Sequence, residues 1–352
     1  MDSNLNYPLV SILIPCYNVE DKVHRLFDSI LGQTYSHYEI IVVNDGSKDR
    51  TEDVIRKYQI IFQQKGIEFL YLLQDNGGVG KACETGLPYV KGDYLCWPDA
   101  DDFYQPECIE KLLTFLLEHK SYDLVRCNAN VYYEDNLSRP TGTLAGNGED
   151  RFREDNMFLD YIQEKNVYFA PVCFMMRFAA LKAANPNMKL YHGRTGQNYQ
   201  MLLPVLYSSK FGYIDEALCC YLIFNGSVSH VFKMPYEMKI QRLEDKHRCV
   251  YDTLLNMSIP INDLNKFEEI EFQKFYTEKC IAAFDYGKIQ DYKELRPQVV
   301  MTYYINKLAV PDRMIKYPIM FKFRYLQKYA KATLRNNRFF EYMLNTIRTI
   351  IK

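Results

Sequence analysis

The first third of the chain alternates short apolar runs with longer stretches in which apolar residues recur every three or four positions. The apolar runs predict buried strands at Leu9–Ile14, Glu39–Val43, Phe69–Leu73 and Tyr94–Cys96. The stretches between them predict helices over Glu20–Leu31, Thr51–Gln64 and Val79–Val90. This alternation favours a mostly parallel sheet that helices cover on both faces. The sequence therefore predicts an α/β fold.

A polar cluster follows each of the four predicted strands. The clusters are Pro15–Asn18, Asn44–Ser47, Asp75–Gly78 and Asp99–Asp102. Pro15 is expected to stop the first strand. Ligands of open parallel sheets bind beyond the carboxyl ends of the strands. We therefore expect all four clusters to converge on one edge of the sheet.

The last cluster, Trp97-Pro98-Asp99-Ala100-Asp101-Asp102, carries three carboxylates in four positions. Carboxylates this close repel one another unless a cation neutralises them, and oxygen ligands suit Mg²⁺ or Mn²⁺ better than zinc. The alternative is an acidic turn before the helix predicted from Cys108, because Asp and Pro are common at helix starts. The residues of this cluster alone leave both interpretations open.

Several ordered motifs in this part of the chain resemble the family 2 glycosyltransferases, which are inverting enzymes with the GT-A nucleotide-sugar fold. The matching segments are Val10–Asn18, Glu39–Asp49, Asn76–Gly78 with Ala82 and Gly86, and Gly92–Tyr94 leading into the acidic cluster. The resemblance implies a nucleotide-sugar donor, with UDP as the nucleotide, and Mn²⁺ or Mg²⁺ as cofactor. It also implies a glycan or lipid-linked glycan acceptor, as in bacterial capsule and cell-wall polysaccharide synthesis.

The resemblance implies a nucleotide-sugar site built from all four clusters. Its expected members are Pro15, Tyr17, Asn18, Asp45, Asn76, Lys81, Asp99, Ala100 and Asp101. Tyr17 would offer a flat face to a base, and Asp45 would accept hydrogen bonds from a uracil-like base. The alternatives are a packed core tyrosine and ordinary Asp-Gly-Ser turn chemistry.

The phosphate side of this predicted site lies at the start of a helix. Asn76 and Gly77–Gly80 open that helix, so its backbone N–H groups and positive dipole end could face phosphate. Lys81 would neutralise phosphate charge, or else be a solvated lysine. In the acidic cluster, the resemblance assigns Asp99 to the ribose side and Asp101 to the cation, with both counted as candidate metal ligands.

The identity of the general base is open because this chain departs from the family pattern. Relatives commonly have Glu-Asp where this chain has Gln197-Asn198, and an amide cannot take the proton of the acceptor hydroxyl. The candidate bases are His192, which titrates near neutrality, Asp215 with Glu216, and Asp102. For each of these residues a structural role is the alternative, and Asn198 would orient the acceptor by hydrogen bonds.

The middle of the chain predicts further elements with weaker patterns. They are a helix at Cys108–His119, a strand at Asp123–Asn128, an exposed loop at Ser138–Asp150, a helix at Glu154–Glu164, an apolar acceptor-side segment at Val167–Phe178, a helical run at Met201–Tyr207, and strands at Phe211–Ile214 and Leu218–Phe224. Ser227–His230 resembles the closing segment of these enzymes, and His230 would contact the diphosphate.

Beyond residue 231 the pattern becomes helical, at Met238–Asn256, Phe267–Phe284 and Tyr317–Lys352. We therefore expect a GT-A domain over 1–231, with a nucleotide-binding half (1–105) and an acceptor half (106–231), and a helical basic region over 232–352. Residues 316–352 interleave basic with apolar side chains. This pattern suits either the anionic face of a membrane or a packed helix with a solvated basic face.

Composition adds few constraints to this picture. The chain has 352 residues, 48% of them hydrophobic and 25% charged, as in ordinary globular proteins. A net charge of −1 gives no reason to expect a nucleic-acid partner. The ten cysteines lack a C-x-x-C spacing and are expected to be reduced core residues. With no apolar leader or long apolar run, we expect a protein of the cytoplasm or of the inner face of the cell membrane.

The sequence thus predicts a metal-dependent inverting glycosyltransferase. One alternative is a sugar nucleotidyltransferase, although such enzymes usually carry a Gly-rich loop where this chain has Pro15–Asn18. The other is a non-catalytic protein that binds nucleotide sugars, which Gln197-Asn198 would suit.

Overall fold

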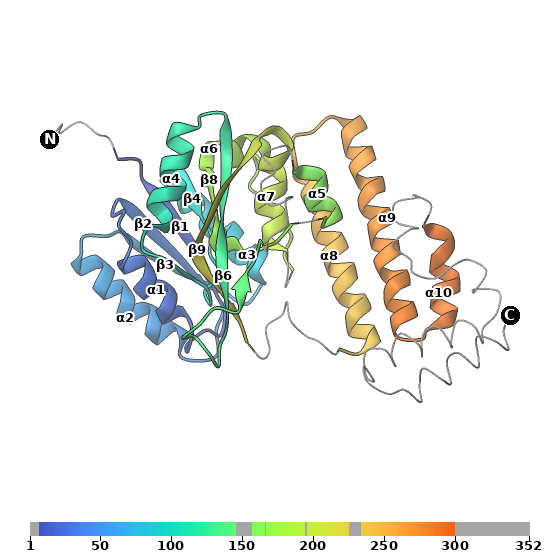
Figure 1. Ribbon diagram of the computed structural model, residues 1–352, viewed down its shortest axis with the longest axis horizontal. Coiled ribbons are helices and arrows are strands. Elements are labelled where there is room, and N and C mark those ends of the chain that lie inside the picture. The colour runs from blue at the N-terminus through green and yellow to red at the C-terminus, as the bar shows by residue number, and fades with distance from the viewer. Residues whose placement is uncertain (1–6, 146–156, 166, 194–195, 225–233, 300–352) are drawn as a thin grey trace. The chain divides into compact units, whose positions relative to one another are not determined.

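The computed structural model of the chain describes residues 7–145, 157–165, 167–193, 196–224 and 234–299 (Figure 1). Its strands are β1 (Val10–Cys16), β2 (Tyr38–Asn44), β3 (Phe69–Leu73), β4 (Tyr94–Cys96), β5 (Phe103–Tyr104), β6 (Tyr122–Tyr133), β7 (Gly142–Thr143), β8 (Phe174–Arg177) and β9 (Lys210–Ile223). Its α-helices are α1 (Val23–Leu31), α2 (Thr51–Gln64), α3 (Val79–Gly86), α4 (Cys108–Glu118), α5 (Phe158–Gln163), α6 (Phe178–Ala184), α7 (Gln197–Ser208), α8 (Tyr236–Asn256), α9 (Ile261–Asp285) and α10 (Ile289–Leu295).

The strands form one mixed sheet in the order β3-β2-β1-β4-β8-β6-β9-β5, with β7 paired to β6. The half that contains β3, β2, β1 and β4 is parallel, which confirms the predicted α/β architecture. The other half is mixed, because β8 runs antiparallel to both β4 and β6, and β5 and β7 are also antiparallel to their neighbours. The helices of this region flank the sheet (Figure 1).

The strands that the sequence did not predict are short or interrupted. β8 has four residues inside the apolar segment expected to line the acceptor side, and β5 and β7 have two residues each. Runs of this length carry no periodicity that separates a strand from other buried structure. The two predicted strands between 211 and 224 are one strand, β9, because a bulge near Asp215 bridges them without ending the pairing to β6.

β1 lies in the centre of the parallel half, and all seven of its residues are buried. It pairs with β2 from Val10 to Cys16 but with β4 only from Val10 to Ile12. Pro15 therefore stays within the strand, and the expectation that it stops β1 is wrong. At Pro15 the strand has a neighbour on one side only, where a missing N–H donor is tolerated.

α1 and α2 cover the same face of the parallel half through a cluster of aromatic rings. The Phe27 ring centroid lies 6.0 Å from that of Phe62, and Phe62 stacks on Phe69 of β3 at 5.6 Å. The buried residues of α1 are those of the predicted inner face, namely Val23, Leu26, Phe27 and Ile30. This packing holds α1 and α2 against the parallel half of the sheet.

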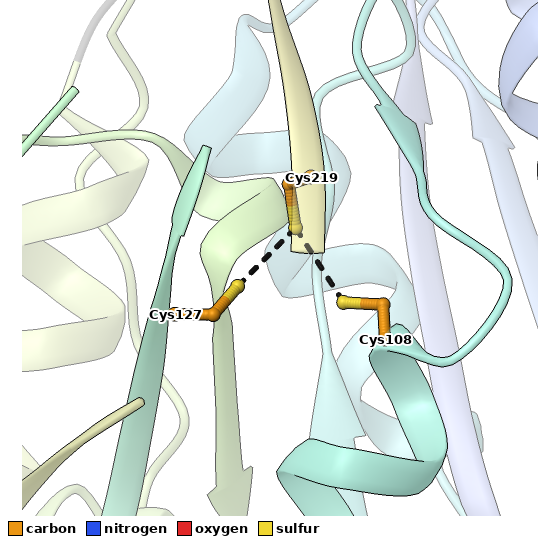
Figure 2. Close-up of side chains that lie close together, drawn as sticks. All are labelled: Cys108, Cys127 and Cys219. Atoms are coloured by element: carbon orange, nitrogen blue, oxygen red, sulfur yellow. Dashed lines mark hydrogen bonds between the residues drawn. The ribbon is translucent and has the colours of Figure 1, made fainter. Parts of the chain in front are cut away.

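All ten cysteines are free and buried, which confirms the prediction of reduced core residues. Figure 2 shows three of them meeting from β9, β6 and the start of α4, where the Cys219 sulfur lies 3.5 Å from that of Cys108 and 3.4 Å from that of Cys127. The Cys219 thiol donates to the Val172 carbonyl at 3.1 Å. Burial raises the pKa of Cys108 and Cys219 well above the usual range, whereas for Cys127 burial is outweighed by the hydrogen bonds within the cluster, which lower the pKa. The three sulfurs are thus joined by hydrogen bonds.

The described chain divides into two compact units. The first contains the residues up to 224 together with Asp245–Glu268, and the second contains the residues from 234 to Glu244 and from Glu269 onward. Within the first unit, Lys246 Nζ lies 2.9 Å from Glu164 Oε1. The Phe267 ring packs on that of Phe158, with centroids 4.6 Å apart. The predicted boundary at 231/232 stays a prediction, but the first unit extends into a later segment of the chain.

The second unit consists of helix in its described part, which agrees with the predicted helical C-terminal region. Lys279 Nζ lies 2.8 Å from Glu244 Oε1, and the buried pair of Lys274 and Glu271 is 3.1 Å apart. No helix in the described ranges has both the length and the apolar character to cross a membrane. The basic segment 316–352 and the segment with His230 lie outside the described residues.

Candidate active site

The loop after β1 is bound to the loop after β2 by Asn18. Its Oδ1 accepts a hydrogen bond from the Lys48 N–H at 2.8 Å, and its own N–H donates to Ser47 Oγ at 3.0 Å. Asn18 adopts a left-handed conformation (φ +52°), which asparagine tolerates better than most residues. The side chain of Asn18 thus shapes the loop that carries Tyr17.

Tyr17 itself is 47% exposed, so it is not a packed core tyrosine. Pro15 is buried within β1, one residue before the strand ends. The structure therefore leaves the Tyr17 ring available to a ligand at the carboxyl end of β1.

Asp45 is buried, and its carboxylate binds the loop before α3. Its Oδ1 accepts from Gln74 Nε2 at 2.6 Å and from the Gly77 N–H at 2.8 Å, and its Oδ2 accepts from the Gly78 N–H at 2.8 Å. Asn76 Nδ2 donates to the backbone oxygen of Asp45 at 3.1 Å. A carboxylate offers about four acceptor positions, so these contacts leave about one for a ligand.

Two glycines make this loop possible. Gly46 and Gly78 have φ angles of +69° and +88°, and a Cβ on Gly46 would lie 2.8 Å from the Asn76 nitrogen. The N–H groups of Gly77 and Gly78, which were expected to face phosphate, are taken up by Asp45. These two N–H groups are therefore not free to bind a ligand.

The acidic turn lies directly after β4. Carboxylate oxygens of Asp99, Asp101 and Asp102 all lie within 4.8 Å of one another. Burial, with added contributions from the charges of Asp101 and Asp49, raises the pKa of Cys16 at the end of β1. The same influence of Asp99 and Asp45 acts on Cys83 of α3. Because β1, β2, β3 and β4 run parallel, the loops that follow them lie at one edge of the sheet, where the predicted clusters converge.

Asp102 anchors the acidic turn to β9. Its Oδ1 accepts the Leu222 N–H at 2.9 Å, and its Oδ2 is buried without a hydrogen-bond partner among the described residues. Burial and the charges of Asp101 and Asp99 raise its pKa well above the usual range. One oxygen of Asp102 is therefore committed to β9, and its role as a candidate base stays a prediction.

Asp99 and Asp101, the other two acids of the turn, also have raised pKa values. Burial and the charge of Asp101 raise the pKa of Asp99, and the hydrogen bond from Gln197 lowers it in part. Burial also raises the pKa of Asp101, against the opposing charges of Lys22, which directly precedes α1, and of Arg25 on α1. Both pKa values stay raised, so these two cations compensate the acids incompletely. Oxygen donors at this spacing fit a hard divalent cation.

Gln197 and Asn198 begin α7, and both differ from the Glu-Asp expected by resemblance. Gln197 Nε2 donates to Asp99 Oδ1 at 2.7 Å. Asn198 Oδ1 is buried and has no partner in the described part of the chain. The structure therefore brings Gln197 to the acidic turn, a contact that sequence reasoning missed.

His192 and Lys81 meet at a shared carboxylate on α3. His192 Nε2 lies 3.1 Å and Lys81 Nζ 3.4 Å from Glu84 Oε1, and Glu84 Oε2 accepts the Leu190 N–H at 2.8 Å. Burial works against the charged form of Glu84, but the bonds from Leu190, His192 and Lys81 prevail and lower its pKa. Lys81 and His192 thus form one cluster with Glu84.

Asp215 and Glu216 lie elsewhere on β9. Tyr213 Oη donates to Asp215 Oδ1 at 3.1 Å, and Glu216 Oε2 lies 2.6 Å from Lys111 Nζ of α4. Asp215 precedes Leu222, the residue that holds Asp102, by seven positions, which at the usual rise of a strand is roughly 20 Å. The structure does not bring this pair to the acidic turn.

A parallel half-sheet with an acidic turn after β4, and binding loops at the same edge, defines an α/β protein of the GT-A type. The sequence model of glycosyl transferase family 2 matches residues 11–184 of the chain, in agreement with the predicted family.

Relatives and solved structures agree with this assignment. Glycosyltransferase GlyA of Streptococcus pneumoniae is 27% identical over 299 residues, which cover 75% of this chain and 40% of GlyA. The chain spans 37% to 40% of the length of the first curated relatives. S. aureus TarS 1–349 has a TM-score of 0.58 at 17% identity and covers 91% of this chain and 92% of its own. Mannosyltransferase PcManGT from Pyrobaculum calidifontis has a TM-score of 0.50 at 13% identity, over 91% and 87% of the two chains. At these identities the two structures show the fold alone.

Proposed function

We propose that this protein is a metal-dependent inverting glycosyltransferase that moves a sugar from a UDP-sugar to a hydroxyl of a glycan or lipid-linked glycan. The observation that carries the proposal is the acidic turn, because Asp99 and Asp101 lie at the sheet edge that also bears Tyr17 and Asp45. TarS was solved in complex with UDP-GlcNAc, and PcManGT in complex with GDP-Man and Mn²⁺. These complexes support a nucleotide sugar as donor and a divalent ion as cofactor.

The predicted site residues take the following roles in this proposal. Tyr17 stacks on the base, and the remaining acceptor position of Asp45 binds its imide or the ribose. Lys81 faces the diphosphate, and Asn76, Asn18 and Pro15 shape the loops. Asp101 and Asp99 would hold Mn²⁺ or Mg²⁺, with Ala100 between them. When bound, the ion would offset the charge that grows on the departing diphosphate.

The chemistry is a single displacement at the anomeric carbon. The acceptor oxygen forms the new bond, the bond to the diphosphate oxygen breaks, and the hydroxyl proton passes to a base. Asn198 cannot take that proton, but its buried Oδ1 can accept a hydrogen bond from the hydroxyl and orient it. Among the candidate bases, His192 combines a half-exposed ring with a place just before α7, so it is the first to substitute.

A panel of sugar donors tests the proposal. Purified protein is incubated with UDP-glucose, UDP-galactose, UDP-GlcNAc and GDP-mannose, with membrane extract as acceptor source, and the released nucleoside diphosphate is measured. We expect release from a UDP-sugar in Mn²⁺ and none in EDTA. Release that is insensitive to EDTA would refute the metal dependence, and the absence of release from every donor would refute the transferase.

A second candidate is a non-catalytic protein that binds nucleotide sugars. The amide pair Gln197-Asn198 favours it, because neither side chain can act as a base. Donor binding without release in the same panel would support this candidate. The family match favours glycosyl over nucleotidyl transfer, and release of pyrophosphate from a nucleoside triphosphate and a sugar phosphate would reverse that preference.

Membrane contact is part of the proposal and depends on the sequence of residues 316–352. Nine lysines and arginines stand there against one glutamate, interleaved with aromatic and aliphatic residues. Such a segment would bring the enzyme to the anionic cytoplasmic face of a membrane, where a lipid-linked acceptor is found. Sedimentation with vesicles of anionic lipid, but not with neutral vesicles, is the expected result.

A further inference from the structure

We propose that Gln197 is a positioning residue, which sets the carboxylate of Asp99 for the nucleotide sugar without adding charge to the acidic turn. This inference rests on the proposed function, since it concerns how the same site binds its donor. It differs from the expectation drawn from the family pattern, in which this position carries a carboxylate.

The contact itself is specific. Gln197 Nε2 donates to Asp99 Oδ1 at 2.7 Å and joins residues that are 98 positions apart in the chain. Gln197 is 8% exposed, so water competes little for this bond. No other hydrogen bond to the Asp99 side chain occurs in the part of the chain that the structure describes. With Oδ1 fixed by the amide, Oδ2 remains for a ribose hydroxyl or a cation.

The backbone that carries Gln197 is held in place from behind. Gly196 has a φ angle of +95°, and a Cβ at this position would lie 2.4 Å from the Cys249 sulfur. The Cys249 thiol in turn donates to the Gly196 carbonyl at 3.4 Å. One turn further along α7, the side chain of Gln200 binds the backbone of Tyr191. The donor group of Gln197 is therefore presented from a fixed helix start, as positioning of a binding group requires.

The amide suits this position better than a carboxylate. The acidic turn already carries three carboxylates whose oxygens lie within 4.8 Å of one another. A glutamate at 197 would bring a fourth to hydrogen-bond distance of Asp99, where like charges disfavour each other. A glutamine supplies an N–H donor of the same length without that charge. Position 197 therefore departs from the family pattern because Asp99 gains a hydrogen-bond donor there without a further negative charge.

Binding of UDP to the full-length protein in excess Mn²⁺, measured by calorimetry, tests the inference. The test variant is Gln197→Leu, and Gln273→Leu is the matched control, because Gln273 of α9 is also a buried glutamine whose Nε2 donates to a carboxylate, that of Glu269, at 2.9 Å. Loss of a hydrogen bond to a charged group should weaken UDP binding by Gln197→Leu about tenfold or more. Gln273→Leu should bind UDP within about twofold of the wild type, even where it lowers the unfolding temperature as much, because Glu269 is not a residue of the proposed site.

Gln197→Glu keeps the shape of the side chain and so guards against a failure of the leucine variant to fold. If the amide positions Asp99, this variant also binds UDP more weakly, although it adds an oxygen donor near the proposed ion. Wild-type affinity in Gln197→Leu, or tighter binding by Gln197→Glu, would overturn the inference. Absence of UDP binding by the wild-type protein would instead refute the proposed function, so the two failures are distinguishable.

Discussion

Asp102 accepts the backbone N–H of Leu222, whereas Asp99 is held by the side chain of Gln197, and the charges of Lys22 and Arg25 act on the pKa of Asp101. The three acids, which are equivalent as a sequence pattern, therefore differ in what each can do. Asp102 stabilises the turn against β9, and the other two remain for ligand. Asp101 is the one whose loss should affect chemistry more than folding.

Asp101→Asn should lower Mn²⁺-dependent release of UDP from the donor sugar by about a hundredfold or more, because an amide offers the ion one weaker ligand and no charge. A coupled assay of UDP release measures the effect. Asp215→Asn is the control, since this residue lies on β9 away from the acidic turn, and its activity should stay within about twofold of the wild type. Equal losses in both variants would argue against a special role of Asp101.

Tyr17 allows a second test at the level of single residues. Its ring is 47% exposed at the end of β1, so a base can stack on it. Base stacking contributes about 1–3 kcal/mol, and Tyr17→Ala should therefore weaken UDP binding about tenfold. Tyr17→Phe keeps the ring and should bind as the wild type does. If both variants bind equally, the ring does not contact the base.

Sequence reasoning could find these residues only where the signal is local. Tyr17 and the three acids follow apolar runs directly, so the strand pattern predicts their place at the sheet edge. The bond between Gln197 and Asp99 spans 98 positions and leaves no local trace. The sequence likewise could not show that the Asp45 carboxylate already accepts hydrogen bonds from Gln74, Gly77 and Gly78.

Among the elements, α3 has the clearest electrostatic tie to the site. Glu84 on its last turn binds the Leu190 backbone, His192 and Lys81, and its pKa is lowered as a result. A lowered folded-state pKa stabilises the protein above the unfolded value of 4.5, and this contribution is lost as the pH falls through the folded pKa. The tie between α3 and the 190–192 segment should therefore weaken in acid.

Glu84→Gln should accordingly lower the free energy of unfolding at pH 7, and its difference from the wild type should shrink as the pH falls below 4.5. Urea denaturation over a pH series measures both. Glu52→Gln is the matched control, because Glu52 forms an exposed pair with Arg56 on α2 and contributes little. A difference for Glu84→Gln that is the same at every pH would contradict the assigned charge interactions.

The elements themselves were predicted to the extent that their patterns are long. α2 and β3 have the predicted bounds, and α1 begins three residues late because residues 20–22 form a turn, in which the Lys22 N–H donates to the Val19 carbonyl. β8 was missed, since its four residues give no period. Its antiparallel pairing to β4 and β6 is a tertiary property that the local sequence does not encode.

In the whole molecule, the first compact unit includes residues 245–268, although residues up to Glu244 that belong to the second unit come before them in the chain. α8 reads as one continuous helix in the sequence, so no pattern marks the point where its contacts change from one unit to the other. The predicted helical region from 232 onward could therefore be found, but not this division of its residues.

Phe267→Ala tests whether the first unit depends on this returning segment. The buried Phe267 ring packs on Phe158 and Tyr207, and its removal should lower the free energy of unfolding by about 3 kcal/mol. Leu255→Ala is the control, because Leu255 is half exposed on α8 and should change stability by less than about 0.5 kcal/mol. Thermal unfolding measures the stability of both variants. Equal stability of the two would show that the segment is dispensable.

In the proposed function, Asp99 and Asp101 hold a divalent ion against the diphosphate of a nucleotide sugar. Anomalous diffraction at the manganese edge, from crystals of the full chain grown with Mn²⁺ and UDP, can locate that ion. We expect an anomalous peak at the carboxylates of Asp99 and Asp101, with UDP phosphate oxygens completing its coordination and the uracil on Tyr17. UDP bound at this edge with no manganese at the acidic turn would contradict this proposal.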